Sequence, residues 1–473
     1  MGKLKGFLEY PRATPAQRTV EERLKDYNDV NEPLDEPLLQ QQAARCMDCG
    51  IPFCHSLGCP LLNLIPEWND YVYQGRWDEA LQRLEITNNF PEITGRICPA
   101  PCEAACTLAI NDSAVTIRQN ELMIIEHAFS RGLIKPKGPR SATGKRVAVI
   151  GSGPSGLSAA QQLARLGHFV IVFEKNRQIG GLLRYGIPNF KLEKWVIDRR
   201  LEQLSAEGVT FETDVNVGDD ISVRFLRRSS DAVLLACGAE QPRDLPVPGR
   251  ELGGVLFAMQ YLCNSTGVLM GELPHGSLIS AADKHVLVIG GGDTGSDCVG
   301  TANRQGARSV HQIEILPMPP AWDRPWNPDW PDWPNIRRDS SSHKEGCERS
   351  WSVLTKAFKG SNGKVTHAAC VRVEWEKSNG AWNMNELPGS EFSIKADLVI
   401  LAMGFTGIQP SKLVTDLNIE LTGNSIADVN RYGMTSQQGV FAAGDAVLGP
   451  SLVVRSILQG RQAAQGIHTY LMK

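Results

Sequence analysis

The sequence predicts an α/β protein in which a helical N-terminal domain is followed by two parallel-sheet domains. Up to residue 130 the apolar residues have helical spacing, as in "EPLLQQQAARCMDC" and "AVTIRQNELMIIEHAFSR". After residue 144, short apolar runs such as "RVAVIGSG", "FVIVFEK", "DAVLLACGA" and "HVLVIGGGD" alternate with helical segments. This alternation is typical of parallel sheets with crossover helices. The segment between the two parts, "RGLIKPKGPRSATGKR", is rich in Gly, Pro and Lys and is expected to be a linker.

The composition indicates a globular protein of several domains. A chain of 473 residues is too long for one core, and we expect roughly two to four domains. A hydrophobic content of 42% and a charged content of 21% are ordinary for globular proteins. The net charge of -3 predicts no binding to nucleic acid or to an anionic membrane. We see no signal peptide and no apolar run long enough for a transmembrane helix, so a cytoplasmic location is expected.

Seven of the twelve cysteines lie in two short segments near the N-terminus. The segments are "CMDCGIPFCHSLGC", with Cys46, Cys49, Cys54 and Cys59, and "RICPAPCEAACT", with Cys98, Cys102 and Cys106. In a reducing compartment, closely spaced cysteines bind metal or do redox chemistry more often than they form disulfides. The five scattered cysteines are expected to be buried as small hydrophobic residues.

A first dinucleotide-binding motif lies in "KRVAVIGSGPSGLSAAQQLARLGHFVIVFEK". A strand is followed by Gly151, Gly153 and Gly156 in the G-x-G-x-x-G pattern, and then by an apolar-periodic helix. These glycines permit a tight turn, close approach to a pyrophosphate and close packing of helix on strand. Glu174 ends the next strand, where a carboxylate accepts hydrogen bonds from a ribose diol. The motif therefore predicts a dinucleotide site.

Two further stretches favour FAD at this first site. The glycine pair of "GGLLRYGIP", which includes Gly181, follows the acidic residue. "GVFAAGDAVLGPSLVVRSILQ" places Gly444 and Asp445 after a late strand. An Asp at this point reaches a flavin ribityl hydroxyl, and the next helix can direct its N-terminus at the flavin ring. The alternative for Gly444 and Asp445 is an ordinary turn at the end of a strand.

The second motif, "KHVLVIGGGDTGSDCVGTANRQGARSVHQIEIL", repeats the plan with Gly290, Gly292 and Gly295. Because the first site is expected to bind a flavin, the fold around this second motif is expected to bind a nicotinamide cofactor. Arg304 and Arg308 could bind the 2′-phosphate of NADPH. Glu314, at the end of the following strand, could instead accept the 2′-hydroxyl of NADH. The slight preference is for NADPH, and the alternative for either arginine is a solvated surface charge.

The cysteine spacing C-x2-C-x4-C-x4-C fits neither ferredoxin pattern. A four-thiolate zinc site would use four of the seven cysteines and leave three. Seven cysteines suggest two iron–sulfur sites of four ligands each, with one of the eight ligands not a cysteine. A flavin that is reduced by hydride transfer needs one-electron acceptors, and iron–sulfur clusters provide them.

These motifs together resemble the small (beta) subunit of glutamate synthase. The stretches that carry the resemblance are "GFLEYPR", "CMDCGIPFCHSLGCPLLNLIPEWND", "GRICPAPCEAACTL", both glycine motifs, "EILPMPP" and "AAGDA". The same module resembles the N-terminal part of dihydropyrimidine dehydrogenase and subunits of NAD(P)H–ferredoxin oxidoreductases. The resemblance implies two [4Fe–4S] clusters in the helical domain and an FAD domain into which an NAD(P)H domain is inserted. The implied divisions are 1–143 for the iron–sulfur domain, 144–280 and 405–473 for the FAD domain, and 281–404 for the nicotinamide domain.

The resemblance also implies ligands for the clusters. One cluster would take Cys46, Cys49, Cys54 and Cys106, and the other would take Cys59, Cys98 and Cys102. Where dihydropyrimidine dehydrogenase has a glutamine as the eighth ligand, the matching position here is Glu121, with Gln119 as the second choice. The alternative for Glu121 is a surface carboxylate.

The function that follows is electron entry into glutamate synthase. Electrons would pass from NAD(P)H to FAD and through the clusters to a large FMN-containing subunit, which makes two L-glutamates from L-glutamine and 2-oxoglutarate. No side chain is expected to act as acid, base or nucleophile, although Lys191 and Arg184 could lie beside the flavin. The alternatives are an electron-transfer subunit of an NAD(P)H–ferredoxin oxidoreductase and a zinc-binding interaction protein.

Overall fold

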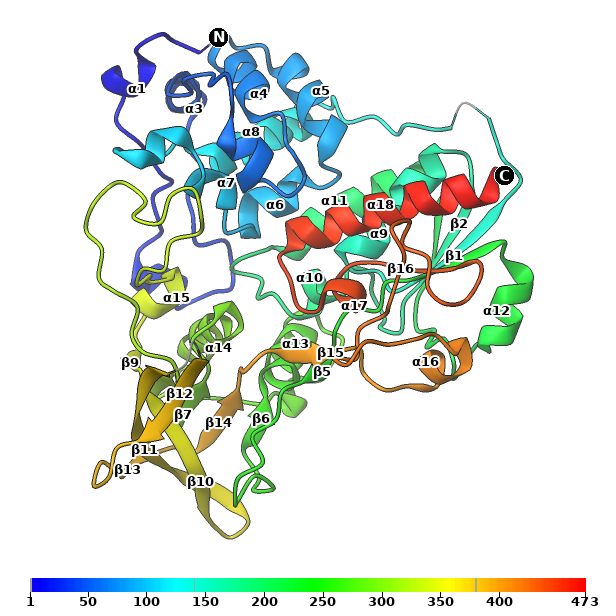
Figure 1. Ribbon diagram of the computed structural model, residues 1–473. Coiled ribbons are helices and arrows are strands. Elements are labelled where there is room, and N and C mark those ends of the chain that lie inside the picture. The colour runs from blue at the N-terminus through cyan, green and yellow to red at the C-terminus, as the bar shows by residue number, and fades with distance from the viewer. Residues whose placement is uncertain (1, 140, 379–380) are drawn as a thin grey trace.

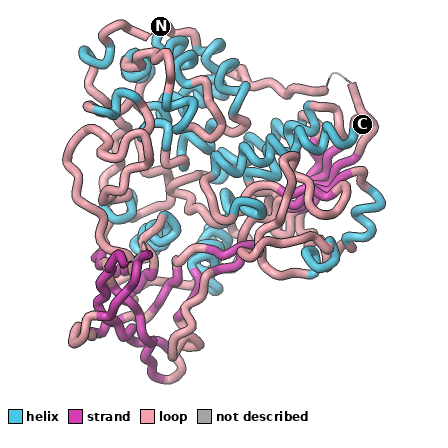
Figure 2. The backbone as a smooth tube through the Cα atoms, in the orientation of Figure 1, coloured by secondary structure: helices cyan, strands magenta, loops and turns pink. Residues whose placement is uncertain are grey.

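The computed structural model describes residues 2–139, 141–378 and 381–473. The end of the molecule that holds the N-terminus is helical, and the strands lie in two separate places with helices beside them (Figure 2). The predicted linker has no regular secondary structure between Leu133 and Lys145 in its described part, and its residue 140 lies outside the described residues. The predicted fold class, a helical domain followed by two Rossmann-like domains with the second inserted in the first, is confirmed by the sheet order.

The N-terminal domain consists of short helices and tight turns. Its elements are α1 (Gly6–Glu9), α2 (Val20–Arg23), α3 (Glu36–Ala44), the π-helical turn η1 (Cys54–Gly58), α4 (Ile65–Tyr73), α5 (Trp77–Thr87), α6 (Pro91–Ile97), α7 (Pro101–Ala104), the 3-10 turn η2 (Thr107–Ile110) and α8 (Ile117–Ser130). Several begin with proline in the first turn, where the missing N–H costs nothing. The cysteine segments lie on the shortest of these elements and the turns beside them, with Cys54 in η1 and Cys102 in α7.

The first sheet has five parallel strands in the order β16-β4-β1-β2-β3. They are β1 (Arg146–Ile150), β2 (Phe169–Phe173), β3 (Val209–Glu212), β4 (Ala232–Leu235) and β16 (Val440–Ala442). The helices of this domain are α9 (Pro154–Arg165), α10 (Leu182–Tyr185), α11 (Lys194–Ala206), α12 (Val223–Ser229), α16 (Lys412–Leu417), α17 (Asp445–Leu448) and the C-terminal α18 (Val453–Leu471). Helices α9 and α18 lie side by side on one face (Figure 1), where a Cβ on Gly460 would lie 2.1 Å from the Ser155 carbonyl oxygen.

The second sheet has five parallel strands in the order β6-β14-β7-β8-β9. They are β6 (Val255–Phe257), β7 (His285–Ile289), β8 (Ser309–Ile313), β9 (Glu348–Ser350) and β14 (Leu398–Leu401). Its helices are α13 (Ala258–Leu269), the 3-10 turn η3 (His275–Ser277), α14 (Asp293–Arg304) and α15 (Ser341–Lys344). An antiparallel extension is formed by β10 (Val353–Ser361), β11 (Lys364–Ser378), β12 (Ala381–Glu386) and β13 (Phe392–Lys395).

The chain crosses between the two sheets through one antiparallel ribbon. Strand β5 (Gln241–Pro242) leads out of the first sheet and pairs with β15 (Phe405–Gly407), which leads back. Strand β6 already belongs to the second sheet, although it precedes the expected boundary at residue 281. The expected return at residue 405 coincides with β15.

One apolar core joins the helical domain to the first sheet domain. It includes Trp68, Phe90 and Ile124 from the helices and Leu157 and Leu163 from α9. Because protein interiors are densely packed, this shared core holds the cysteine segments in a defined position relative to the first glycine turn.

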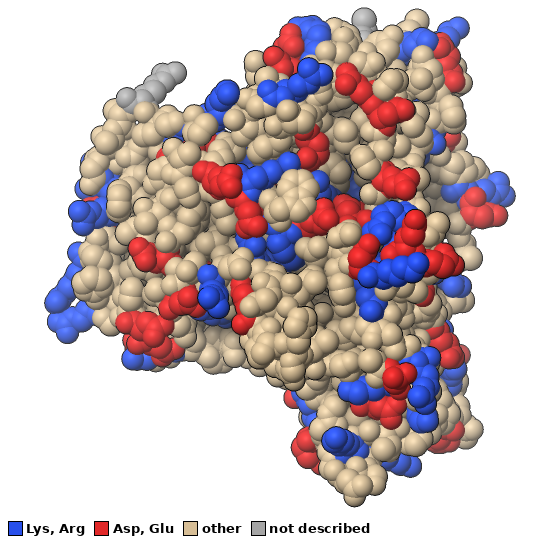
Figure 3. All heavy atoms as spheres, turned by 180° about the vertical axis from the view of Figure 1, so that it is seen from behind, with Lys and Arg blue, Asp and Glu red and all other residues tan. Residues whose placement is uncertain are grey.

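The surface carries charges of both signs. Lys and Arg side chains are interspersed with Asp and Glu over the face in Figure 3, without a patch of one sign. A mixed surface of this kind agrees with the net charge of -3. Within the described residues, no helix has the length and apolar character needed to span a bilayer.

Candidate functional site

A cavity of about 1040 Å³ lies where the three parts of the molecule meet. The first sheet domain contributes its glycine turn, Glu174 and Asp445 to the lining. The second contributes the first turns of α14, with Asp293 and Asp297, and the helical domain contributes Cys98. The volume is at the upper end of what small-molecule and cofactor sites occupy. The cavity therefore connects both nucleotide folds to a cysteine segment.

The first glycine turn is shaped for a pyrophosphate. Gly151 has a φ of +103°, and a Cβ there would lie 2.4 Å from the Ala236 carbonyl oxygen. A Cβ on Gly156 would lie 2.0 Å from the Gly151 carbonyl oxygen, so α9 packs directly on the turn. Gly153, which caps α9, has no protein atom within 4 Å of a Cβ position and lines the cavity. The backbone is thus open at the point where the free N–H groups of a helix attract phosphate.

Glu174 lies directly beside this turn. Its Oε2 accepts hydrogen bonds from the Ser152 N–H (3.2 Å) and the Ser152 hydroxyl (2.5 Å), and its Oε1 accepts from the Asn176 N–H (2.9 Å). A Cβ on Gly181 would lie 3.0 Å from the Gly153 Cα, so the predicted glycine pair packs against the same turn. This is the arrangement in which a carboxylate at the end of the second strand meets a ribose.

Asp445 also lines this cavity, and Gly444 comes directly before it. A Cβ on Gly444 would lie 2.5 Å from the Ser155 hydroxyl oxygen, because the end of β16 abuts the start of α9. Asp445 Oδ1 accepts hydrogen bonds from the Ser451 (2.7 Å) and Ser456 (3.1 Å) hydroxyls. Burial raises the pKa of Asp445, although these hydroxyls oppose the shift. Leu452, the N-cap of α18, also lines the cavity, so a helix N-terminus faces it as the sequence predicts.

The second glycine turn reproduces the first. Gly290 has a φ of +123°, and a Cβ there would lie 2.2 Å from the Ala402 carbonyl oxygen. A Cβ on Gly295 would lie 2.3 Å from the Gly290 carbonyl oxygen, while one on Gly292 would have no neighbour within 4 Å. Because both turns carry the same steric constraints, the residues present at each fit a dinucleotide.

The structure contradicts the prediction that Arg304 binds a 2′-phosphate. Its guanidinium donates two hydrogen bonds to Glu345, and its side chain is 1% exposed. It also lies 3.7 Å above the ring of Phe190. The guanidinium is thus fully engaged inside the protein.

Arg308 is exposed but lies at the wrong edge of the sheet. Its N–H donates to the Lys284 carbonyl, at the start of β7, whereas the glycine turn follows the end of β7. A 12-residue helix such as α14 is roughly 18 Å long. The end of α14 and the residue before β8 are therefore remote from the turn, and sequence proximity to the motif was misleading.

Glu314 does lie at the correct edge. Its Oε2 accepts a hydrogen bond from the Gly291 N–H at 2.6 Å. The position matches that of Glu174 in the first fold, where the Ser152 N–H is the donor. A carboxylate here can accept the 2′-hydroxyl of a nicotinamide nucleotide and would repel a 2′-phosphate.

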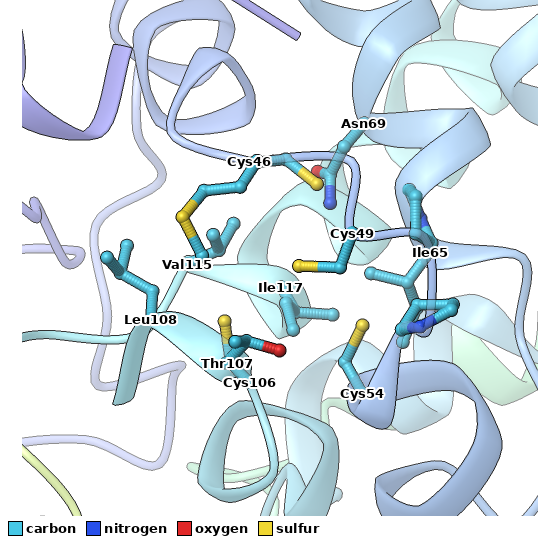
Figure 4. Close-up of a pocket in the computed structure, with 13 residues that line it drawn as sticks. Cys46, Cys49, Cys54, Ile65, Asn69, Cys106, Thr107, Leu108, Val115 and Ile117 are labelled. Carbon is cyan, nitrogen blue, oxygen red and sulfur yellow. The ribbon is translucent and has the colours of Figure 1, made fainter. Parts of the chain in front are cut away.

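Four cysteines surround one space in the helical domain. Figure 4 shows the sulfur atoms of Cys46, Cys49, Cys54 and Cys106 turned toward it, with apolar side chains such as Ile65, Leu108 and Ile117 as the walls. Burial raises the pKa of Cys54, and the neighbouring Cys106, Cys46 and Cys49 add to the effect. Soft thiolates enclosed in an apolar pocket suit an iron–sulfur cluster, so these residues fit the group.

The other three cysteines form a second group with Glu121. Burial raises the pKa of Cys102 well above its usual value, and Cys59, Cys98 and Glu121 contribute to the shift. A Cβ on Gly58 would lie 2.7 Å from the Cys102 Cα, so η1 and α7 are in direct contact. This grouping of thiols with one carboxylate has four ligand-type side chains, which is the number that a cluster needs.

Glu121 is buried, in contrast to the surface alternative. It is 6% exposed, and its Oε1 accepts hydrogen bonds from Asn88 (3.0 Å) and Thr94. Burial raises the pKa of Glu121 to about 7. Gln119 is two residues away, about 200° around the helix, so both residues cannot face the same thiols.

The thiol groups are costly to ionise without a bound cation. Burial raises the pKa of Cys46, Cys59 and Cys98 to about 12 in each case. All twelve cysteines are free of disulfides. No group of three or more His, Cys, Asp or Glu side chains in the described part of the chain could hold a single metal ion.

One feature of the cysteine region was not found by sequence reasoning. Asp48, Leu62 and Ala100 have positive φ values of 49°, 54° and 65°. Strained residues of this kind persist where the surroundings impose the conformation, commonly at functional sites. The residue types of Leu62 and Ala100 gave no signal, because the residues that favour this region besides glycine are asparagine, aspartate and histidine.

The Pro- and Trp-rich loop of residues 317–334 reaches the helical domain (Figure 1). The Trp330 indole N–H donates to the Cys106 carbonyl at 3.1 Å, and its ring lies 4.8 Å from that of Phe53. The Asn327 N–H donates to the Ala109 carbonyl at 2.7 Å. The loop therefore ties the inserted domain to the first cysteine group.

Of the two cations predicted near the flavin, only Lys191 lines the cavity. Arg184 is 2% exposed and donates from Nε to the Ile179 carbonyl at 2.7 Å, while its terminal nitrogen pairs with Asp198. Arg184 is therefore a buried structural cation, and the prediction that it lies beside the flavin does not describe it.

Comparison with protein families places the fold in a class. Residues 145–460 match the model described as pyridine nucleotide-disulphide oxidoreductase, and residues 23–133 match the one described as dihydropyrimidine dehydrogenase domain II, 4Fe-4S cluster. The fold and the site thus define a pyridine-nucleotide oxidoreductase with an N-terminal iron–sulfur domain. The small chain of glutamate synthase [NADPH] from Mycobacterium tuberculosis is 52% identical over 99% of this chain and 96% of its own length. The chain therefore belongs to the family of glutamate synthase small chains, and the resemblance seen in the motifs is confirmed.

Other relatives agree with this family. The small chain from Bacillus subtilis is 45% identical over 100% of this chain and 99% of its own length. In Schizosaccharomyces pombe, "Glutamate synthase [NADH]" is 47% identical over 99% of this chain, which spans only 23% of that longer protein. Among solved structures, Mycobacterium tuberculosis FprA in complex with NADPH aligns with a TM-score of 0.56 at 17% identity, over 70% of this chain and 85% of that one. This last likeness concerns the fold alone.

Proposed function

We propose that this chain is the electron-input subunit of a glutamate synthase. It oxidises NAD(P)H with FAD in the first fold and passes the electrons through two [4Fe–4S] clusters to a large subunit, which makes two L-glutamates from L-glutamine and 2-oxoglutarate. The observation that supports this most directly is the cavity of about 1040 Å³, whose lining comes from both nucleotide folds and from Cys98. Bound FAD supplies the conversion of one two-electron transfer into two one-electron transfers.

In this proposal, the residues of the chain bind the two nucleotide cofactors and orient them. Gly153 and the N-terminus of α9 receive the FAD pyrophosphate, Glu174 the adenosine ribose and Asp445 the ribityl chain. Gly292 and the N-terminus of α14 receive the nicotinamide pyrophosphate. The three enclosing domains exclude water and keep the two rings in one orientation, which is the main contribution that a protein makes to hydride transfer.

The clusters would be held by the two thiol groups of the helical domain. One takes Cys46, Cys49, Cys54 and Cys106, and the other takes Cys59, Cys98, Cys102 and Glu121. The second group lies nearer the flavin site, since Cys98 lines the cavity. Domain limits of 1–143, 144–280 with 405–473, and 281–404 remain our division of the chain, with β6 attached to the inserted domain.

The partner in this proposal is a glutamate synthase large subunit. The relative from Schizosaccharomyces pombe carries the counterpart of this chain as 23% of one longer glutamate synthase polypeptide, which supports a stable association. Free thiols throughout the chain suit a cytoplasmic location. Co-purification with the large subunit tests the pairing, and a chain that binds only ferredoxin-like acceptors would contradict it.

Paired glycine substitutions test which cofactor each fold binds. Gly156→Ala puts a Cβ 2.0 Å from the Gly151 carbonyl oxygen, and Gly295→Ala puts one 2.3 Å from the Gly290 carbonyl oxygen. We expect Gly156→Ala to weaken FAD binding about tenfold or more, because overpacking displaces the turn. Gly295→Ala should keep FAD and lose nicotinamide affinity by a similar factor. The measurements are flavin content and titration of the flavin spectrum with NADP⁺.

Gly138→Ala is the matched control, since a Cβ there has no neighbour within 4 Å. It should retain both cofactors. Loss of flavin from Gly295→Ala together with its retention in Gly156→Ala would show that the two folds are assigned the wrong way round.

Glu314→Gln tests the recognition of the nicotinamide ribose. The glutamine can still accept from the Gly291 N–H, but the negative charge is removed. We expect the ratio of kcat/KM with NADPH to that with NADH to rise about tenfold, because repulsion of a 2′-phosphate is relieved. Steady-state assays with both nucleotides measure it, and Arg308→Gln, at the remote edge, should leave the ratio unchanged.

A further inference from the structure

A buried asparagine borders the first cysteine group. Asn69, in α4, is 0% exposed and lines the same space as Cys46, Cys49, Cys54 and Cys106. Figure 4 shows its amide group pointing toward that space. The Nδ2 atom of this amide has no hydrogen-bond partner among the residues that the structure describes. A buried donor without a partner costs stability, so its presence beside four thiols calls for a physical reason.

A second asparagine determines which way the amide of Asn69 faces. Asn120, in α8, is also 0% exposed, and its Nδ2 donates to Oδ1 of Asn69 at 2.8 Å. This bond uses the oxygen of Asn69 and leaves the nitrogen on the side of the thiols. The sulfur atoms of an iron–sulfur cluster accept hydrogen bonds, so a cluster in this space would favour the nitrogen of the amide over its oxygen.

Asn69 lies on a densely packed part of the helical domain. Trp68 and Val72, on the same helix, are fully buried, and Ile65, one turn before Asn69, lines the same space. Side chains in such a core have little freedom to move. The donor is therefore held in position by the protein itself, which is the condition for electrostatic preorganisation.

The amide beside the second cysteine group is already used by the protein. Asn88 Nδ2 donates to the Thr94 hydroxyl oxygen at 2.8 Å and to Glu121 Oε1 at 3.0 Å. Both hydrogen atoms of that nitrogen are thus engaged, whereas the nitrogen of Asn69 keeps both of its own. The two cysteine groups therefore differ in the hydrogen bonding that they offer to a cluster.

We propose that Asn69 donates an amide N–H to a sulfur atom of the cluster held by the first cysteine group and thereby raises the reduction potential of that cluster. This inference rests on the proposed function and adds to it a residue that tunes one cluster without being its ligand. A donor stabilises the reduced cluster more than the oxidised one, because reduction adds negative charge to the sulfur atoms. The higher potential favours electron transfer to the first group from the second, which lies nearer the flavin site.

Asn69→Leu tests the proposal, because leucine has a similar branched shape but no donor. We expect iron and sulfide to be retained and one of the two cluster potentials to become more negative. The equilibrium constant for one-electron reduction should fall about tenfold, which corresponds to about 59 mV. The other cluster potential should stay unchanged. A redox titration of the anaerobic holoenzyme, followed by EPR spectroscopy, measures both potentials without turnover.

Asn264→Leu is the matched control. The amide of Asn264, in α13, bonds within the inserted domain to the Ser277 carbonyl (3.0 Å) and the Ile279 N–H (2.7 Å). This variant should keep both potentials of the original chain. If Asn69→Leu retains its iron and matches Asn264→Leu in both potentials, the proposal is overturned. Absence of iron and sulfide from both the original chain and the control refutes the proposed function instead.

Isotope labelling provides a readout that does not depend on a substitution. With ¹⁵N in the asparagine side chains of the original chain, pulsed EPR of the reduced protein should detect a nitrogen coupled to a cluster. The coupling should be missing from labelled Asn69→Leu. If Asn69→Leu loses the first cluster or does not fold, the coupling in the original chain supports the proposal. A coupling that is absent from the original chain, or that persists in Asn69→Leu, overturns it.

Discussion

Replacing Cys98 by alanine should remove about four of about eight irons from the anaerobically purified protein and leave FAD bound. Cys98 is 8% exposed and belongs to the group that contains Cys59, Cys102 and Glu121. With one thiolate missing, that group cannot retain a four-ligand cluster, whereas the first cysteine group is complete. Iron, acid-labile sulfide and flavin are measured on the same sample.

The Cys98→Ala variant should also distinguish reduction of the flavin from delivery of electrons to an external acceptor. NAD(P)H should still reduce the flavin, since neither glycine turn is altered. Electron delivery to an external one-electron acceptor should fall roughly 100-fold, the upper end of what damage to a metal site costs. Cys347→Ala, outside the helical domain, is the control and should keep the full iron content. Loss of flavin with all iron retained would contradict the placement of the second cluster.

Replacing Glu92 by glutamine should destabilise the protein by about 3–5 kcal/mol, because it leaves a buried arginine without its counter-ion. Arg200 donates two hydrogen bonds to Glu92, at 2.7 and 2.6 Å, and the two side chains are 3% and 0% exposed. The pair joins α6 of the helical domain to α11 of the first sheet domain. The contact therefore determines how the helical domain is held against the flavin site.

Urea unfolding followed by far-UV circular dichroism measures this loss. The double variant Glu92→Leu with Arg200→Met should recover most of the stability, because an apolar pair replaces two buried charges. Glu79→Gln, which breaks the exposed Arg76–Glu79 pair, should cost far less stability, because solvent screens an exposed ion pair. If Glu92→Gln costs no more than Glu79→Gln, the buried pair does not hold the domains together.

The prediction from sequence was most successful where the backbone conformation is determined by residues close together in the chain. Both glycine turns lie where the motifs predict, because Gly151 and Gly290 need positive φ and Gly156 and Gly295 leave no room for a Cβ. Such requirements involve residues a few positions apart, so a short stretch of sequence contains them completely. The insertion of one sheet in the other was expected from the resemblance alone, since strand order depends on distant pairings.

The prediction failed where a long side chain had several possible partners. Arg304 follows a nucleotide-binding helix, yet it pairs with Glu345 and stacks on Phe190. Arg184 lies in a glycine-rich flavin motif, yet it pairs with Asp198. These partners come from other segments of the chain, and neither spacing nor composition indicates which partner will be near.

By itself, the sequence determined the kinds of chemistry that this protein can support: two dinucleotide turns, and cysteines spaced for clusters rather than disulfides. Those properties are local, since they depend on the sterics of neighbouring residues. Only the tertiary structure decided that Cys98, the flavin turn and the nicotinamide helix share one cavity, and that Lys191 meets Asp297 inside it. Contacts between distant segments depend on how whole domains pack, and that packing is a property of the folded chain.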